Sequence, residues 1–138
     1  MRSGGERIER LVLDTSAYSQ IRYGHAGVLD LVAASVVVLV PTIVLGELEA
    51  GFVGGQRTAD NRRVLADFLD EPFVAVLDAT RSVAQRYGET FGQLRQAGTP
   101  MSTNDIWIAA AALDCGGHLA TFDRDFERVS GLSLTVLS

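Results

Sequence analysis

The chain has 138 residues, which is enough for one domain with a substantial buried core. Hydrophobic residues make up 47% and charged residues 21%, a balance that excludes an intrinsically disordered chain. The formal net charge of −5 excludes a protein that coats nucleic acid through bulk positive charge. It does not exclude an enzyme that holds phosphate through metal ions in an acidic pocket.

The first half of the chain alternates apolar runs with helix-compatible stretches. Leu11–Asp14 is predicted to be a buried strand that ends on a carboxylate, and Thr15 and Ser16 are candidate caps of the next helix. The β-branched run over residues 36–40 is typical of a parallel strand covered on both faces. The elements predicted after that first strand are helices over residues 15–22 and 28–35, the strand over 36–40, a helix over 42–52 with Thr42 as its cap, and a helix over 58–69.

The second half continues the same alternation. Asp78 or Thr80 is predicted to cap a helix that ends near Gly98, and Ser102 to start the next helix, which stops at Gly116. Strands are predicted over residues 73–77, 118–121 and 134–137.

Strands that alternate with helices through short connections predict an α/β fold. We expect a single domain over residues 10–138, with a mostly parallel central sheet flanked by helices. Residues 1–9 are expected to form a disordered N-terminal lead. In sheets of this kind the functional site lies beyond the carboxyl ends of the strands.

Residues 28–48 are strongly apolar, but they do not predict a membrane span. The charge-free run covers only residues 31–46 and is interrupted by Pro41, whereas a spanning helix needs about 20 apolar residues. The charged N-terminus is unlike a secretory signal. The single cysteine, Cys115, excludes an internal disulfide. We therefore expect a cytoplasmic protein.

Four acids stand where strands and helices meet. Asp14 ends the first strand, Glu47 lies in the helix after the second strand, Asp105 is in the first turn of its helix, and Asp123 follows the strand that ends at Thr121. In a parallel sheet these positions open onto one edge. Two carboxylates about 4 Å apart repel by roughly 4 kcal/mol at an effective dielectric near 20. Such a cluster must therefore hold a cation, share protons or accept an arginine.

Each acid also has an explanation without catalysis. Asp14 fits a helix cap or a turn, Asp105 forms a capping box with Ser102, and Asp123 fits a surface turn. Helical phase does not choose between Glu47 and Glu49. Taken together, however, oxygen ligands with no histidine or cysteine beside them favour Mg²⁺ or Mn²⁺. A hard ion of this kind in an open carboxylate site suits phosphodiester hydrolysis.

Four stretches of the chain resemble PIN domains, and within them the VapC toxins of bacterial toxin–antitoxin pairs. The resemblance covers roughly residues 10–137 and is carried by residues 11–16 (LVLDTS), 44–48 (VLGEL) with Gly51, 103–110 (TNDIWIAA) and 119–126 (LATFDRDF). It implies a parallel sheet between helices and an endoribonuclease that depends on Mg²⁺ or Mn²⁺.

By position, the resemblance assigns the family's acidic quartet and settles Glu47 over Glu49. Asp14, Asp105 and Asp123 would hold the metal, while Glu47 would orient or deprotonate the attacking water. The residues implied as supporting hydrogen-bond partners are Thr15, Asn104 and Thr121, and Asp125 is implied as an additional contributor.

The resemblance also implies an RNA substrate, a small antitoxin partner that covers the site, and a homodimer. Candidate apolar surfaces for these partners lie on the helices over residues 28–35, 42–52 and 64–69. The candidate contacts to the RNA backbone are Arg57, Arg62, Arg63, Arg81, Arg86 and Arg124.

Other function classes fit the sequence less well. A phosphoacceptor receiver domain needs a lysine, and this chain has none because all twelve basic residues are arginines. A haloacid-dehalogenase-type phosphatase expects an aspartate where Ser16 stands, and no P-loop motif is present. The serious alternative is a catalytically inactive PIN-like binding module, against which the retention of all four acids speaks.

Overall fold

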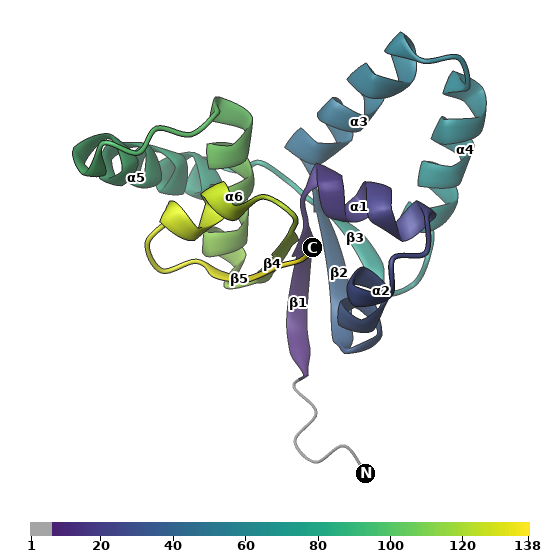
Figure 1. The fold of residues 1–138 in the computed structure, drawn as a ribbon, viewed down its shortest axis with the longest axis horizontal. Helices are drawn as coiled ribbons and strands as arrows, with labels where there is room; N and C mark the ends of the chain where they lie inside the picture. Colours follow the sequence, from purple (N-terminus) through teal and green to yellow (C-terminus); the bar gives the residue numbers. More distant parts are fainter. Residues whose placement is uncertain (1–6) are drawn as a thin grey trace.

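The computed structural model describes residues 7–138 and has five strands in one sheet, in the order β3-β2-β1-β4-β5 (Figure 1). Every neighbouring pair is parallel. The predicted parallel α/β fold is therefore confirmed. The strands are β1 (Ile8–Leu13), β2 (Ser35–Pro41), β3 (Val74–Leu77), β4 (His118–Thr121) and β5 (Ser133–Val136).

Six α-helices and one 3₁₀ helix connect the strands. Figure 1 shows α3 and α4 as a helical hairpin that projects beyond the carboxyl ends of the strands, while α5 and α6 lie on the opposite side of the molecule. The helices are α1 (Thr15–Arg22), α2 (Ala26–Ala33), α3 (Thr42–Gly54), α4 (Thr58–Leu69), α5 (Arg81–Ala97), α6 (Thr103–Cys115) and η1 (Arg124–Arg128).

The direction of the strand order reverses at β1. The chain adds β2 and β3 on one side of β1 and then crosses to place β4 and β5 on the other. Ligand crevices of parallel sheets form at this type of switch point, outside the carboxyl ends of the strands. The switch point here lies at the adjacent carboxyl ends of β1 and β4, directly before Asp14 and Phe122.

The core is centred on β1, the middle strand of the sheet, and on its two neighbours. Leu11, Val12 and Leu13 of β1 are fully buried, as are Leu119 and Ala120 of β4. Helix α6 packs here through Ala109 and Ala112, whereas Ala110 and Ala111 are buried with Val83 of α5 in a second cluster. The close approach of chain segments near the end of α6 leaves little room for side chains.

Gly117 shows how tight this packing is. A Cβ atom at Gly117 would lie 2.8 Å from Cγ2 of Val12 and 3.0 Å from Sγ of Cys115. The preceding Gly116 ends α6 in the left-handed conformation with φ 65°. The sequence predicted that the helix ends at this glycine.

Several boundaries differ from the prediction. Strand β1 begins at Ile8, so it includes residues assigned to the N-terminal lead; residues 1–6 of that lead lie outside the described residues. Helix α2 begins at Ala26 because His25 caps it, with Nδ1 accepting from the Val28 amide at 3.3 Å.

Of the three residues that the sequence offers as caps of α1, Asp14 is the N-cap residue, and Thr15 and Ser16 are not. The predicted cap of α3 is wrong. Pro41 occupies the N-cap position of α3, and the hydroxyl of Thr42 donates instead to the carbonyl oxygen of Leu77 at 3.3 Å.

In the described part of the chain, no helix has the length and apolar character needed to cross a membrane.

The glycine packing makes a testable prediction about stability. We expect Gly117→Ala to lower the free energy of unfolding by about 1–3 kcal/mol, because the new methyl group overpacks a filled core. Gly88→Ala is the matched control: Gly88 lies inside α5 with no atom within 4 Å of its added Cβ, so it should stabilise by about 0.5–1 kcal/mol. Urea unfolding measures both changes, and equal effects of the two substitutions would contradict the packing described here.

Candidate active site

Asp14 is the most buried acid at the switch point, with 5% of its surface exposed. It follows β1 and caps α1: its Oδ1 accepts hydrogen bonds from the Ala17 amide and the Ser16 hydroxyl, both at 2.8 Å. Its Oδ2 accepts from the Thr121 hydroxyl. Asp14 therefore has the role of a helix cap, and its carboxylate is also tied to β4.

The end of β4 is joined to Asp14 through Thr121. The Thr121 hydroxyl is completely buried; besides donating to Asp14, it accepts from the backbone amide of Asp123 at 3.0 Å. The carboxylate of Asp123 in turn accepts from the Asp125 amide at 2.8 Å and starts η1. One hydroxyl thus connects the first acid with the turn that carries the last.

Glu47 is held by side chains from two other helices. The Thr15 hydroxyl of α1 donates to Oε1, and the Asn104 amide of α6 donates to Oε2 at 3.2 Å. Glu49 has a different setting, because it pairs with Arg62 of α4 at 2.7 Å. Thr15 and Asn104 were predicted as supporting partners of the acids, and both contact Glu47.

All four acids of the predicted quartet line one small hollow of about 170 Å³. Asp105 reaches it from the first turn of α6, where its backbone amide donates to the Ser102 hydroxyl at 3.3 Å. Within residues 7–138, no basic residue lines the hollow. Its lining residues are Asp14, Thr15, Ser16, Glu47, Asp105, Ile108 and Asp123.

The acids influence one another electrostatically. Burial raises the pKa of Asp14, and the charge of Asp123 raises it further, although hydrogen bonds from Thr121, Ala17 and Ser16 oppose the shift. Burial also raises the pKa of Asp105, to which the charges of Asp123, Glu47 and Asp14 add. The ionised forms of both carboxyl groups are therefore disfavoured, and a cation in the hollow would stabilise those forms and lower both pKa values.

The donor set fits a hard divalent ion that keeps part of its water shell. Among residues 7–138, no three acidic, histidine or cysteine side chains converge closely enough to enclose a metal on their own. Mg²⁺ typically binds through one or two carboxylates and retains several waters, so a complete protein cage is not required. Oxygen donors without nitrogen or sulfur agree with that ion class.

The structure places Asp125 and Ser16 differently around the hollow. The side chain of Asp125 does not line it and forms an ion pair with Arg128 at 3.2 Å, while its backbone amide donates to Asp123. Ser16 was not predicted as a partner of the acids, yet its hydroxyl contacts Asp14 and it lines the hollow. The only sequence signal for Ser16 is its place two residues after Asp14, where it also fitted a helix cap.

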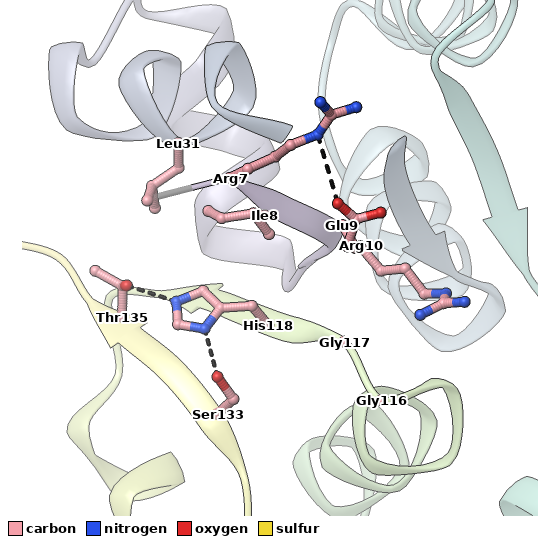
Figure 2. A pocket seen from close by; sticks show the side chains of 10 residues that line it. All are labelled: Arg7, Ile8, Glu9, Arg10, Leu31, Gly116, Gly117, His118, Ser133 and Thr135. Atoms are coloured by element: carbon pink, nitrogen blue, oxygen red, sulfur yellow. Dashed lines mark hydrogen bonds and ion pairs between the residues drawn. The ribbon is translucent and has the colours of Figure 1, made fainter. Parts of the chain in front are cut away.

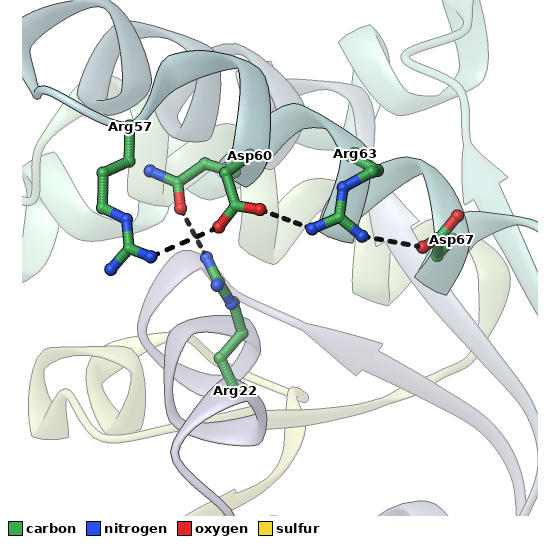
Figure 3. A network of polar contacts seen from close by, with 6 residues as sticks. Arg22, Arg57, Asp60, Arg63 and Asp67 are labelled. Carbon is green, nitrogen blue, oxygen red and sulfur yellow. Dashed lines mark hydrogen bonds and ion pairs between the residues drawn. The ribbon is translucent and has the colours of Figure 1, made fainter.

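Most arginines proposed as RNA contacts already have acidic partners. Figure 3 shows Asp60 between Arg57 and Arg63, and Arg63 also reaches Asp67. Hydrogen bonding and the charge of Arg63 lower the pKa of Asp60. Three other candidates each form an ion pair with a glutamate: Arg62 with Glu49, Arg86 with Glu89, and Arg124 with Glu127. These exposed pairs are weak, so phosphate could compete for them.

A larger hollow of about 580 Å³ lies at the opposite end of the sheet, where β1, β4 and β5 begin (Figure 2). Its central polar group is His118, whose ring nitrogens lie 2.6 Å from the Ser133 hydroxyl and 2.7 Å from the Thr135 hydroxyl. Among the described residues that line it, Glu9 is the only acid, and Glu9 pairs with Arg7 at 3.4 Å. The acid-lined hollow is therefore the better candidate for an active site.

Comparison with known proteins agrees with this geometry. The family model described as PIN domain matches residues 11–132. The chain belongs to the PIN-domain family. Among its relatives, it is 33% identical to the plasmid stability protein StbB of Pseudomonas syringae pv. tomato over 90% of this chain and 95% of that protein. It is also 29% identical to ribonuclease VapC2 of Rickettsia felis over 77% and 78% of the two chains.

Two solved structures illustrate the likeness of the fold. VapBC2 from Rickettsia felis, bound to a DNA fragment from their promoter, has a TM-score of 0.83 at 23% identity and covers 94% of this chain and 99% of that chain. VapC20 of Mycobacterium tuberculosis, a toxin that cleaves the sarcin-ricin loop, has a TM-score of 0.65 at 24% identity and covers 88% and 95%.

The raised pKa of Asp105 makes a prediction about stability against pH. A folded-state pKa above the unfolded value means that the carboxyl group begins to destabilise the fold as the pH rises through the unfolded pKa, with the full effect above the folded pKa. We expect Asp105→Asn to raise the unfolding free energy at pH 7 in chelator, with the gain disappearing as the pH falls below 3.8, the ordinary pKa of the group.

Asp30→Asn is the control for this measurement, because Asp30 is exposed on α2. Denaturant unfolding at several pH values measures the effect. A loss of stability for Asp105→Asn at pH 7 would contradict the electrostatic description of the hollow.

Proposed function

We propose that this PIN-domain protein is a metal-dependent endoribonuclease that acts as the toxin of a VapBC-type toxin–antitoxin pair. The observation that carries the proposal is the convergence of Asp14, Glu47, Asp105 and Asp123 on one hollow, where no basic residue of the described part of the chain neutralises them. The names of its relatives, ribonucleases VapC1 and VapC2, support the same reaction. We take residues 10–138 as the catalytic unit and the cytoplasm as its location.

The acids divide between holding the metal and handling the water. Asp14, Asp105 and Asp123 would hold Mg²⁺ or Mn²⁺, directly or through water. When bound, the ion would lower the pKa of a water molecule and neutralise charge on the phosphate. Glu47 orients the attacking water and takes its proton, because Thr15 and Asn104 each fix one of its two carboxylate oxygens.

The reaction is a hydrolysis of the RNA backbone. As Glu47 accepts a proton, the water oxygen forms a bond to phosphorus in line with the 3′ oxygen. The bond between phosphorus and the 3′ oxygen breaks, and that oxygen takes a proton from solvent. The products are a 5′-phosphate and a 3′-hydroxyl. The surrounding hydrogen bonds keep the acids in place without having to reorganise during the reaction.

The partners of the toxin are a small antitoxin, which covers the acid-lined hollow, and a second copy of the chain. The VapBC complexes from Rickettsia felis and Haemophilus influenzae support the antitoxin. The apolar stripes predicted as partner surfaces are mostly core, since Val28, Val44, Leu48, Phe52 and Leu65 are buried. The large apolar side chains that are exposed are Tyr23, Leu29, Val36, Val53, Phe73, Val76 and Phe91.

The alternative function, an inactive PIN-like binding module, makes a different prediction about metal. Carboxylates kept close together without a cation cost stability, so an active site should gain stability from Mg²⁺ while an inert module should not. A Mg²⁺ titration followed by thermal unfolding separates the two functions.

Glu47 and Glu49 provide the sharpest test of catalysis. We expect Glu47→Gln to lower kcat for RNA cleavage by about 10²- to 10⁴-fold, the usual contribution of a general base. Glu49→Gln should leave kcat within about twofold, because Glu49 pairs with Arg62 outside the hollow. Gel-based cleavage of RNA in Mn²⁺ measures both variants.

The aspartates complete this test. Asp14→Asn and Asp105→Asn should abolish cleavage while circular dichroism shows a folded protein. Full cleavage in excess chelator, or a Glu49 variant as damaged as the Glu47 variant, would exclude the proposed mechanism.

A further inference from the structure

The Ser16 hydroxyl joins two parts of the hollow that are distant in sequence. It donates to Oδ1 of Asp14 at 2.8 Å and accepts from the Phe122 amide at 3.3 Å. Phe122 directly precedes Asp123 in the chain. A single hydroxyl therefore contacts the carboxylate of one acid and the backbone that presents another.

These contacts leave the two oxygens of Asp14 in different states. Oδ1 accepts from the Ser16 hydroxyl and the Ala17 amide, whereas Oδ2 accepts only from the Thr121 hydroxyl. A carboxylate offers about four lone-pair positions, two on each oxygen. Oδ1 is therefore saturated, and Oδ2 keeps one position for a further ligand.

Helix capping does not account for the Ser16 hydroxyl. The cap of α1 is Asp14, which accepts from the Ala17 amide. Within α1, the Ser16 hydroxyl makes no hydrogen bond to the helix backbone; both of its contacts go to Asp14 and to the turn after β4. Both hydrogen bonds of the Ser16 hydroxyl therefore connect residues at the acid-lined hollow.

We propose that Ser16 is a positioning residue that saturates Oδ1 of Asp14 and holds the turn before Asp123. Asp14 then offers its metal ligand through Oδ2, and Asp123 stays on the same hollow. This inference rests on the proposed function, because it names a residue that prepares the same metal site. Ser16 acts through Asp14 and Asp123 and needs no contact with the substrate.

The test measures Mn²⁺ binding to the full chain by calorimetry, without RNA. We expect Ser16→Ala to raise the Kd for Mn²⁺ by about 10- to 100-fold, as loss of a hydrogen-bond partner to metal ligands usually does. Ser16→Thr keeps the hydroxyl and should bind as the wild type does. Ser16→Cys, with a weak S–H donor, should lie between alanine and wild type.

Ser19→Ala is the matched control, since Ser19 lies on the same helix, is partly buried and does not line the hollow. Thermal unfolding in chelator is measured for each variant, so that loss of fold is separated from loss of metal affinity. Should Ser16→Ala not fold, the ranking of the threonine and cysteine variants carries the test.

The outcomes separate this inference from the proposed function. Wild-type binding of Mn²⁺ with an unchanged Kd in Ser16→Ala overturns the positioning role alone, and a lower unfolding temperature in that variant would then make Ser16 purely structural. A wild-type protein that binds no Mn²⁺ and cleaves no RNA overturns the proposed function, and the role of Ser16 falls with it.

Discussion

Mutual repulsion among carboxylates is the constraint on which the rest of this structure depends. Four acids line one hollow of about 170 Å³, and burial and neighbouring negative charge raise the pKa of Asp14 and Asp105. Groups in that situation would separate or protonate if nothing held them. Donors from α1, α6 and β4 hold Asp14 and Glu47 in fixed orientations, so the hollow is already arranged for a cation.

The fold supplies those donors through its topology. The reversal of strand order places the ends of β1 and β4 side by side, which brings Asp14 next to Thr121. Helix α6 begins at the same edge and carries Asn104 and Asp105 into it. Close packing at Gly117 fixes the far end of α6 against β1. The acids are thus presented from a rigid crevice that the sheet itself creates.

Much of this could be predicted from local sequence. The helix over residues 58–69 and the strand over 118–121 have the predicted bounds, because apolar periodicity marks an element and turn residues end it. Because the carboxyl ends of parallel strands lie at one edge of the sheet, the four acids could also be predicted to lie near one another. That prediction needed only the order of the strands and helices along the chain.

The remaining features depend on contacts between distant residues. Asp14, Thr15 and Ser16 are all good capping residues, so only the packed structure shows that Asp14 is the cap. Glu47 and Glu49 lie at opposite borders of the apolar stripe of their helix, so periodicity does not choose between them, and the contact of Glu49 with Arg62 on α4 distinguishes them. Apolar stripes such as the one containing Phe52 become core only because α3 and α4 fold back on each other. The start of α2 could not be predicted because its cap, His25, is not among the usual capping residues.

The most direct test of the central claim is to locate a metal in crystals of the protein. Crystals grown with MnCl₂ should show an anomalous scattering peak in the hollow, within ligand distance of Asp14 or Asp105 or joined to them by ordered water. The same crystals of Asp14→Asn should lose that peak. A hollow that stays empty at saturating Mn²⁺, or a manganese ion bound only elsewhere on the protein, would contradict the account.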